Sequence, residues 1–410
     1  MKRITLITTA QPTTNPRLVK EAEYLQSLGY EVKAIVCFYE RWADRFDEDI
    51  FSKNPGLYIF CGGSPFGNLF EKLTYYKTRI RQKFCKLAFK LTKNKKFAES
   101  AISRTHVEAL CLAKKTDADL FIAHNLGALP TATKAAKQCG AKIGYDAEDM
   151  DSGQYLSDND YMYLLNLSIE QRYFSTVDYF TAASPLIATI YRQKYNFLNP
   201  VVINNVFPRT NLSPNHEVKN QPVKLFWFSQ TVGINRGIEE VISAMGQIKE
   251  NIELHLLGDC SNDIKCLFLN IALAENLNPK KISFHPPIPS ENIFSFTSTF
   301  DIGLATEIGT PLNRDICLTN KVFTYIQCGL PIIASNTQAQ AMFISEYPKC
   351  GRTYIRDSKQ SLVDTIKQYL DDPELLLNTK KYNYALGQEV LNWEIESKKF
   401  LSVINQTLRL

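Results

Sequence analysis

Short apolar runs alternate along the chain with segments whose apolar residues recur every three or four positions. In the first half the runs predict buried strands, and the three-to-four period predicts a helix over residues 15–28. The strands predicted in this half are Ile4–Thr8, Glu31–Cys37, Leu120–Ala123, Ile143–Tyr145, Tyr179–Ala182 and Val201–Ile203. A repeated strand, helix and strand order predicts a parallel sheet covered by helices.

The same alternation returns in the second half. It predicts strands at Leu225–Phe228, Glu253–Leu257, Ile282–Phe284, Ile302–Ala305 and Ile332–Ala334, and helices at Gly237–Ile248, Ile264–Ala274 and Lys321–Cys328. Between the two series, residues 208–222 are polar, contain three prolines and have no hydrophobic period, which is typical of a linker. The fold class predicted is therefore α/β, with two doubly wound Rossmann-like domains that bind ligands at the carboxyl ends of their strands.

Composition agrees with two soluble domains. A chain of 410 residues with 45% apolar content is too large for one compact core. The ten cysteines are spread singly, without the paired spacing of a zinc site, so we expect reduced thiols and a cytoplasmic location. The first apolar run, Ile4–Ile7, is too short for a signal peptide, and no run approaches the roughly 20 apolar residues of a spanning helix.

Residues 319–335 have the pattern of an anion-binding helix start. Thr319 or Asn320 is expected to cap the helix with a side-chain oxygen, and Lys321 adds a positive charge beside the positive end of the helix dipole. Gly329 then ends the helix and Pro331 blocks its continuation before a buried strand. Such a helix start suits a diphosphate, although an ordinary turn between a helix and a strand has a similar pattern.

Arg236 stands at the start of another predicted helix. A cation is unfavourable at that end of the helix dipole unless an anion is bound, so the position favours a phosphate partner over a solvated surface role. Arg236 and Lys321 together would neutralise a bound diphosphate without a metal ion.

His124 directly follows an apolar strand, and is therefore expected at the carboxyl end of the first sheet. There it would hydrogen-bond a ligand or position a ligand hydroxyl. The alternative is a histidine that is satisfied by the backbone at the strand end. Asp146 and Glu148 follow the next strand and either line the same ligand site or cap the helix that follows.

These segments, taken in order, resemble family-4-type glycosyltransferases of the GT-B fold. The residues that carry the resemblance are Asn15-Pro16-Arg17 before a helix, His124-Asn125 after a strand, Tyr145–Asp149, Phe228–Glu239, and Asn320-Lys321 followed by Gly329-x-Pro331. The resemblance covers most of the chain. It implies transfer of a sugar from a nucleoside-diphosphate donor with retention of configuration, and no metal or other cofactor.

The resemblance also implies which domain binds which substrate. It implies an N-terminal acceptor-binding domain (1–207), a linker (208–222), a C-terminal nucleotide-sugar-binding domain (223–388) and a C-terminal helix (389–410) that crosses back to the first domain, anchored by Trp393. The implied catalytic residues are His124, Arg236 and Lys321. The donor-binding residues proposed with them are Gly233, Arg236, Gly237, Glu307, Asp315, Asn320, Lys321 and Thr324. The acceptor-binding residues are Asn15, Arg17, His124, Asp146 and Glu148.

The carboxylates depart from the family pattern. Related enzymes often have a glutamate five residues before the glycine of Gly-x-Pro and a second one eight residues earlier, where this chain has Thr324 and Ile316. Thr324 offers one hydrogen bond but no charged, bidentate acceptor. Glu307 and Asp315 are themselves eight residues apart but out of register with the glycine, so they either reach the sugar or are solvated surface residues.

The segment Lys72–Lys96 contains ten lysines and arginines and no acidic residue. Its apolar residues recur at helical spacing, at Leu73, Tyr76, Ile80, Phe84, Leu87 and Leu91. A helix with this pattern either lies on an anionic membrane surface or packs its apolar stripe on the core and exposes a basic face. Nucleic acid is not expected as a partner, because no recognised reading motif is present.

The function predicted is sugar transfer from a nucleotide-sugar to a glycan or lipid-linked glycan acceptor in cell-surface polysaccharide biosynthesis. A peripheral position on the inner face of the cell membrane is expected with it. Two alternatives stay open: a nucleotide-sugar epimerase or hydrolase of the same fold, and a catalytically weak scaffold subunit. Product analysis and donor binding without turnover, respectively, distinguish them.

Overall fold

A computed structural model describes residues 1–212 and 222–409, which form two compact units. The first unit comprises Met1–Asn204, Pro311–Asn313 and Ser397–Leu410, and the second comprises Asn205–Thr310 and Arg314–Glu396. Of the predicted linker 208–222, residues 213–221 lie outside the described residues. The assignment of acceptor binding to one unit and donor binding to the other stays a prediction.

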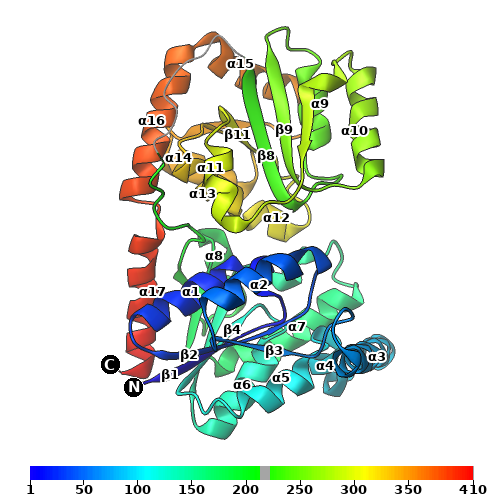
Figure 1. The fold of residues 1–410 in the computed structure, drawn as a ribbon, viewed down its shortest axis with the longest axis vertical. Coiled ribbons are helices and arrows are strands. Elements are labelled where there is room, and N and C mark those ends of the chain that lie inside the picture. The colour runs from blue at the N-terminus through cyan, green and yellow to red at the C-terminus, as the bar shows by residue number, and fades with distance from the viewer. Residues whose placement is uncertain (213–221, 410) are drawn as a thin grey trace. The chain divides into compact units, whose positions relative to one another are not determined.

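The first unit contains a seven-stranded sheet in the order β3-β2-β1-β4-β5-β6-β7, and each pairing of neighbours is parallel (Figure 1). Its strands are β1 (Arg3–Thr8), β2 (Glu31–Cys37), β3 (Tyr58–Cys61), β4 (Leu120–His124), β5 (Lys142–Ala147), β6 (Tyr179–Ala182) and β7 (Val201–Val202). The strands predicted in this half are confirmed. β3 was missed although residues 57–61 form a short apolar run; it is an edge strand whose residues are largely half-buried or exposed.

Helices cover both faces of this sheet. α1 and α2 lie on one face, and α5 and α6 on the other (Figure 1). The helices of the first unit are α1 (Pro16–Ser27), α2 (Asp44–Lys53), α3 (Leu69–Thr92), α4 (Ala98–Ile102), α5 (His106–Ala113), α6 (Leu129–Cys139), α7 (Tyr161–Tyr173) and α8 (Pro185–Lys194). Most of the last helix, α17 (Trp393–Leu408), also belongs to this unit, where the Tyr30 hydroxyl donates to Asn405 Oδ1 at 3.0 Å.

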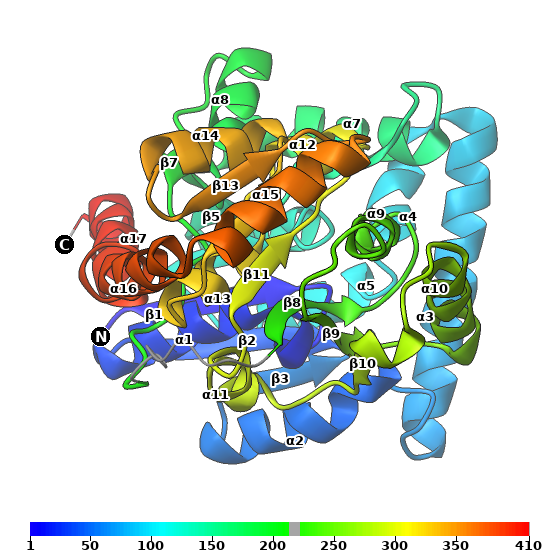
Figure 2. The same cartoon turned by 90° about the horizontal axis from the view of Figure 1, so that it is seen from above.

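The second unit contains a six-stranded sheet in the order β10-β9-β8-β11-β12-β13, again with parallel neighbours (Figure 2). Its strands are β8 (Val223–Thr231), β9 (Ile252–Asp259), β10 (Ile282–His285), β11 (Ile302–Ala305), β12 (Ile332–Ser335) and β13 (Gly351–Tyr354). Its helices are α9 (Ile238–Met245), α10 (Asn262–Ala274), α11 (Ile293–Thr297), α13 (Asn320–Gln327), α14 (Gln338–Glu346), α15 (Lys359–Asp371) and α16 (Pro373–Glu389). The short helix α12 (Leu312–Ile316) is divided, with its first two residues in the first unit and the rest in the second. The predicted strands are again confirmed, and the edge strand β13 was missed.

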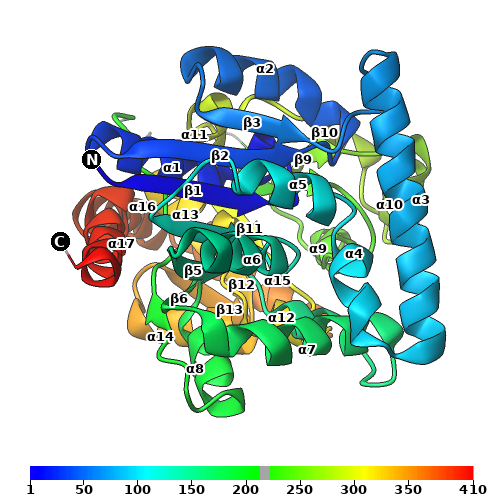
Figure 3. The ribbon, with the colours of Figure 1, turned by 90° about the horizontal axis from the view of Figure 1, so that it is seen from below.

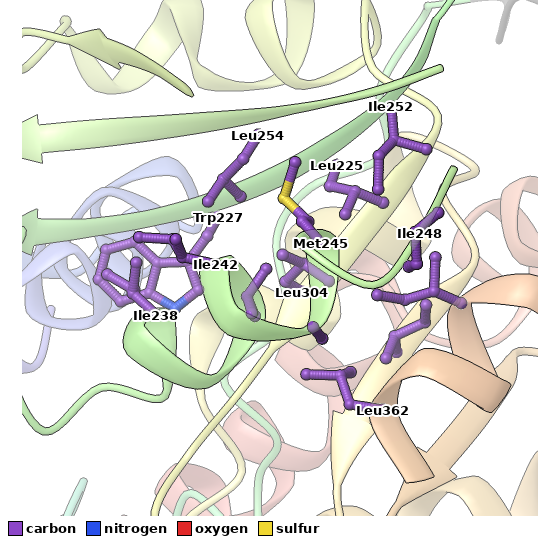
Figure 4. Close-up of a cluster of buried hydrophobic side chains, with 14 of the residues drawn as sticks. Leu225, Trp227, Ile238, Ile242, Met245, Ile248, Ile252, Leu254, Leu304 and Leu362 are labelled. Carbon is purple, nitrogen blue, oxygen red and sulfur yellow. The ribbon is translucent and has the colours of Figure 1, made fainter. Parts of the chain in front are cut away.

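The core of the second unit forms where α9 packs on β8 and its neighbours. Leu225 and Trp227 of β8 meet Ile238 and Ile242 of α9, and all four are buried (Figure 4). Trp227 is among the largest fully buried side chains, and burial of such a ring is worth several times the burial of one methylene group. This packing fixes α9, and with it the loop that enters α9 from β8.

On the other face of the second sheet, α13 lies against β11 with very little space. Gly303 of β11 faces Tyr325 of α13, and a Cβ atom on Gly303 would lie 2.3 Å from the tyrosine ring. The Tyr325 hydroxyl donates to the carbonyl oxygens of Phe226 and Leu304, at 3.1 and 2.9 Å. Gly329, with φ of 70°, ends the helix as predicted.

We expect the Gly303→Ala variant to be less stable than the wild-type protein by about 1–3 kcal/mol, because the added methyl group overlaps the Tyr325 ring and must displace α13. Gly233→Ala is the matched control, since a Cβ atom there meets no atom within 4 Å and the backbone is not left-handed. The measurement is the urea midpoint of each variant. Equal midpoints for both variants would contradict this account of the contact.

Candidate functional site

Two clusters of charged side chains lie at the carboxyl ends of strands, one in each unit. In the first unit, neighbouring strands bring Thr8, His124, Asp146 and Thr181 into register on β1, β4, β5 and β6. Residues in register on adjacent strands point to the same face of a sheet. The row therefore places the imidazole of His124 beside the carboxylate of Asp146.

Arg17 of α1 covers this row. Its Nε and Nη2 atoms donate to the two oxygens of Asp146 at 2.6 and 2.8 Å, and its Nη1 donates to the carbonyl oxygen of Ile203 at 2.7 Å. Both side chains are buried, and the Thr181 hydroxyl also donates to Asp146. Burial would raise the pKa of Asp146, but the Arg17 guanidinium and His124 outweigh burial and lower it.

Glu21, one helical turn after Arg17, was missed in the sequence. Its Oε1 lies 3.3 Å from Arg17 Nε, and its Oε2 lies 3.3 Å from His124 Nε2, inside the protein. The spacing of four residues between Arg17 and Glu21 on a predicted helix was the signal available, because such pairs share one helix face. Glu21 therefore joins the guanidinium to the imidazole.

His124 is fully buried among three carboxylates. Besides Glu21, its Nδ1 atom lies 3.4 Å from Glu148 Oε1 and 3.6 Å from Asp146 Oδ2. Burial alone would lower the pKa of His124, but the carboxylates of Glu21, Glu148 and Asp146 raise it to about 10. The imidazole is therefore a cation at neutral pH, which donates hydrogen bonds and has no lone pair with which to remove a proton.

Asn15 caps α1, as its position in the sequence suggests. Its side-chain oxygen accepts from the backbone N–H of Leu18, and its Nδ2 donates to Glu148 Oε1 at 2.9 Å. The structure thus brings together all five residues predicted for acceptor binding. Glu148 is the least buried carboxylate of the cluster, with 24% of its side chain exposed, so it is the member best placed to meet a ligand.

His124, Asp146 and Glu148 also have ligand atoms within 4.8 Å of one another, a spacing that suits a metal ion. The donor chemistry fits less well. Arg17 already binds both oxygens of Asp146, and a metal would require His124 to give up a proton that three carboxylates hold. The local positive charge is supplied by Arg17 and His124.

In the second unit, the loop from β8 to α9 is held against the end of β11. Gly237, with φ of 75°, caps α9, and a Cβ atom there would lie 2.3 Å from the Thr306 carbonyl oxygen. The Thr306 hydroxyl donates to the carbonyl oxygen of Arg236 at 2.7 Å. Only glycine fits this approach without strain. Arg236 is therefore fixed by its backbone immediately before the helix, as predicted.

Lys321, on the first turn of α13, is buried and paired with a carboxylate. Its Nζ lies 2.7 Å from Glu307 Oε1 and 5.2 Å from the centre of the Trp227 ring. Burial would raise the pKa of Glu307, but Lys321 and Arg236 lower it. In the sequence, Glu307 is out of register with the glycine of Gly-x-Pro. It nevertheless reaches Lys321, because β11 and α13 bring the two residues together.

The remaining predicted donor residues are placed as follows. Asn320 is the first residue of α13, and Thr319 is the cap by position, but neither side chain makes the expected capping hydrogen bond. Thr324 is fully buried inside α13, where its hydroxyl has no partner within the described part of the chain. The structure therefore gives no support to donor contact by Thr324.

Asp315 of α12 is occupied within the protein. Its Oδ1 accepts from the backbone N–H of Gln338 at 3.1 Å and its Oδ2 from the Gln338 side chain at 2.6 Å, while Arg356 lies 3.6 Å away. Through these contacts the side chain of Asp315, which belongs to α12, lies against the first residue of α14. Gly233, in contrast, lies in an open loop with no neighbour within 4 Å of an added Cβ atom.

Three cations and one carboxylate gather in the second unit. Burial and the neighbouring Arg314 both lower the pKa of Arg236, whereas Glu307 raises it only in part. Arg314, missed in the sequence, donates to the Asn235 carbonyl oxygen at 2.8 Å. Across residues 1–212 and 222–409, Arg236 forms no ion pair. The cluster has an excess of positive charge.

Comparison with solved structures identifies the architecture as the GT-B fold, two Rossmann-like α/β domains. The chain is similar to sucrose-phosphate synthase from Thermosynechococcus elongatus, with a TM-score of 0.71, 15% identity and 99% of both chains covered. It is similar to Anabaena HepE in complex with UDP and glucose, with a TM-score of 0.72, 15% identity and coverage of 99% of this chain and 100% of that one.

A third similar structure is WaaG, described as a glycosyltransferase involved in lipopolysaccharide biosynthesis, with a TM-score of 0.62, 13% identity and coverage of 97% and 98%. No family model and no curated protein matches the sequence. The fold expected from the sequence is confirmed. At these identities the likeness establishes the fold, and the activity must be argued from the two clusters.

We expect the protonated state of His124 to stabilise the first unit. Its pKa is raised in the folded state, so its contribution is full below about pH 6.5 and is lost as pH rises to about 10, at up to about 1.4 kcal/mol per pH unit. The measurement is the difference in unfolding free energy between wild type and His124→Gln from pH 6 to 10.

The difference is needed because Lys20 titrates in the same range with the opposite sign. Burial and Arg17 lower the pKa of Lys20 to about 7, so its contribution grows with pH in both proteins and cancels. A difference that stays constant between pH 6 and 10 would contradict a charged His124.

We expect Glu307→Gln to destabilise the second unit by about 3–5 kcal/mol, because the buried Lys321 ammonium loses its carboxylate. The double variant Glu307→Gln/Lys321→Met should recover part of this loss, since it removes the unpaired charge as well. Glu275→Gln is the control: its pair with Lys359 is partly exposed, so the expected loss is below about 1 kcal/mol. Strict additivity in the double variant would refute the pairing.

Proposed function

We propose that the protein is a glycosyltransferase that moves a sugar from a nucleoside-diphosphate-sugar to a glycan or lipid-linked glycan acceptor. The observation that carries the proposal is the excess positive charge around Arg236, Lys321 and Arg314 at the carboxyl ends of β8 and β11. Lys321 is paired with Glu307, whereas Arg236 and Arg314 are half-buried beside them, so a bound diphosphate would supply the negative charge that the cluster lacks. The HepE structures in complex with UDP, with UDP and glucose, and with UDP-glucose support a nucleotide-sugar as the donor.

The proposed chemistry needs positive charge where the leaving group forms. As the bond between the anomeric carbon and the phosphate oxygen breaks, negative charge builds on the diphosphate. Arg236 and Lys321 are the proposed partners of that charge. Glu307 keeps Lys321 in position, and the fixed backbone of Gly237 presents Arg236 before α9. We propose that the reaction proceeds without a metal ion, because these side chains supply the positive charge.

Retention of configuration is proposed with a front-face route. The acceptor oxygen forms its bond to the anomeric carbon on the face from which the diphosphate leaves, and the acceptor proton passes to a departing phosphate oxygen. His124 cannot be the base in this route, because it is protonated at neutral pH. Its proposed role is to position Glu148, the more exposed carboxylate, which is proposed to hydrogen-bond sugar hydroxyls.

The proposed setting is cell-surface polysaccharide biosynthesis, with the protein placed at the inner face of the cell membrane. The description of WaaG as involved in lipopolysaccharide biosynthesis supports this setting. The basic segment Lys72–Lys96 supports a lipid-linked acceptor.

We expect a nucleoside diphosphate to raise the melting temperature of the protein, since a ligand at one hundred times its Kd stabilises the folded state by about 2.7 kcal/mol. UDP is tested first, then GDP, ADP and CMP, each with its sugar conjugates. The shift should be lost in Arg236→Ala and kept in Lys280→Ala, whose exposed lysine lies outside the cluster. A shift that survives in Arg236→Ala would contradict the assignment.

Product analysis then separates the three activities. Sugar transfer to an acceptor supports the proposal. An isomerised or free sugar in the absence of acceptor shows an epimerase or hydrolase, and donor binding without turnover over a broad acceptor set shows a scaffold subunit.

A further inference from the structure

The long helix α3 of the first unit has two faces that differ sharply in their surroundings. Thr78, Cys85 and Phe89 are buried against the unit. Opposite them lies a stripe of large apolar side chains that are exposed to between 56% and 74%: Leu69, Leu73, Tyr76, Ile80, Phe84, Leu87 and Leu91. At about 100° per residue, these seven positions fall within an arc of about 80° centred on Ile80. We call this set the α3 stripe.

The stripe is a fixed feature of the surface. Asn68 and Glu71 form a capping box at the start of α3. Arg104 donates to the Gly62 carbonyl oxygen and the Thr78 hydroxyl at 2.7 and 3.0 Å, and Arg81 pairs with Glu108. These contacts hold the inner face of α3, which runs along the outer side of the first unit (Figure 3).

Cations border the α3 stripe on both sides. Lys77 lies about 60° to one side of Ile80, and Lys83 lies about 60° to the other. Lys72, Arg79 and Lys90 extend the border on the Lys83 side, and Lys93, Lys95 and Lys96 follow the helix; all eight side chains are exposed. From Lys72 to Lys96 there is no acidic residue. The surface thus combines an apolar band with uncompensated positive charge.

We propose that the α3 stripe docks the protein on an anionic lipid membrane, with α3 lying in the plane of the interface. A 24-residue helix is about 36 Å long, and its apolar band would enter the boundary between head groups and acyl chains while the lysines meet anionic head groups. Among the described residues, no helix has the length and apolar composition that crossing a membrane requires. The contact is therefore one of a helix lying on the surface.

A second copy of the chain fits this surface less well than a membrane does. Pairing two α3 stripes face to face would bring the lysine borders of both copies together without a single carboxylate from Lys72 to Lys96 to offset them. An anionic head-group layer supplies the missing negative charge along the whole helix. Charge complementarity therefore selects the lipid surface.

The test is co-sedimentation of the full chain with vesicles of phosphatidylcholine alone or mixed with phosphatidylglycerol. We expect at least about tenfold stronger binding to the mixed vesicles, weakened by added salt. Ile80→Glu/Leu87→Glu should lose about tenfold or more of this binding. The matched control is Leu156→Glu/Leu273→Glu, which makes the same chemical change at two other exposed sites and should bind as wild type does.

A second pair of double variants makes smaller changes at exposed lysines, which are less prone to cause misfolding. Lys77→Gln/Lys83→Gln should reduce binding to the mixed vesicles, whereas Lys114→Gln/Lys115→Gln, at exposed positions of the same unit, should not. Equal binding of the stripe variants and wild type would overturn the proposal. A second result would also overturn it: the wild-type protein is a dimer by light scattering, the Ile80→Glu/Leu87→Glu variant is a monomer, and the variant still binds vesicles.

The membrane contact is separable from the proposed catalytic function. The stripe variants should keep the nucleotide-induced rise in melting temperature, and Arg236→Ala should keep vesicle binding. Failure of one assay leaves the other proposal intact.

Discussion

The buried pair of Arg17 and Asp146 is the interaction on which the first unit's site depends. Removing two ions from water costs several kcal/mol for each, and only good geometry with further hydrogen bonds offsets that cost. Here the guanidinium donates to both carboxylate oxygens, and its Nη1 donates to the carbonyl oxygen of Ile203. The Thr181 hydroxyl donates to the same carboxylate. Because Arg17 belongs to α1 and Asp146 to β5, the pair fixes the helix over the strand ends. Glu21 follows one turn later and reaches His124.

The two clusters differ in the sign of their charge. In the first unit three carboxylates surround two cations, whereas in the second Glu307 alone faces Lys321, Arg236 and Arg314. The second cluster attracts an anion such as a diphosphate. The first repels an anion, and its acceptor atoms suit the hydroxyl groups of a sugar. This difference is the physical reason for proposing that the donor binds at one cluster and the acceptor at the other.

The strands and the fold could be predicted from the sequence because covered parallel strands are continuous apolar runs. The edge strand β13 lacks that signal, whereas the edge strand β3 has a short apolar run that was not recognised. Residues at strand ends and helix starts, such as His124 and Arg236, could also be predicted from position. The side chains that pair with the site residues could not be predicted from the sequence. Glu307 meets Lys321 through the packing of α13 on β11, and burial, which decides that Thr324 is enclosed, is not visible in a helical period.

The sequence of the α3 stripe also leaves two interpretations open, and the structure decides between them. An apolar stripe with basic borders predicts a membrane-surface helix and a core-packed helix equally well, because both bury the stripe. The core of the first unit takes the opposite face, with Thr78, Cys85 and Phe89, which is less apolar than the face left outside. A helix that packs its weaker apolar face inward keeps its stronger one for another apolar environment. The positive borders of the stripe make an anionic lipid surface the environment that satisfies both its apolar and its charged residues.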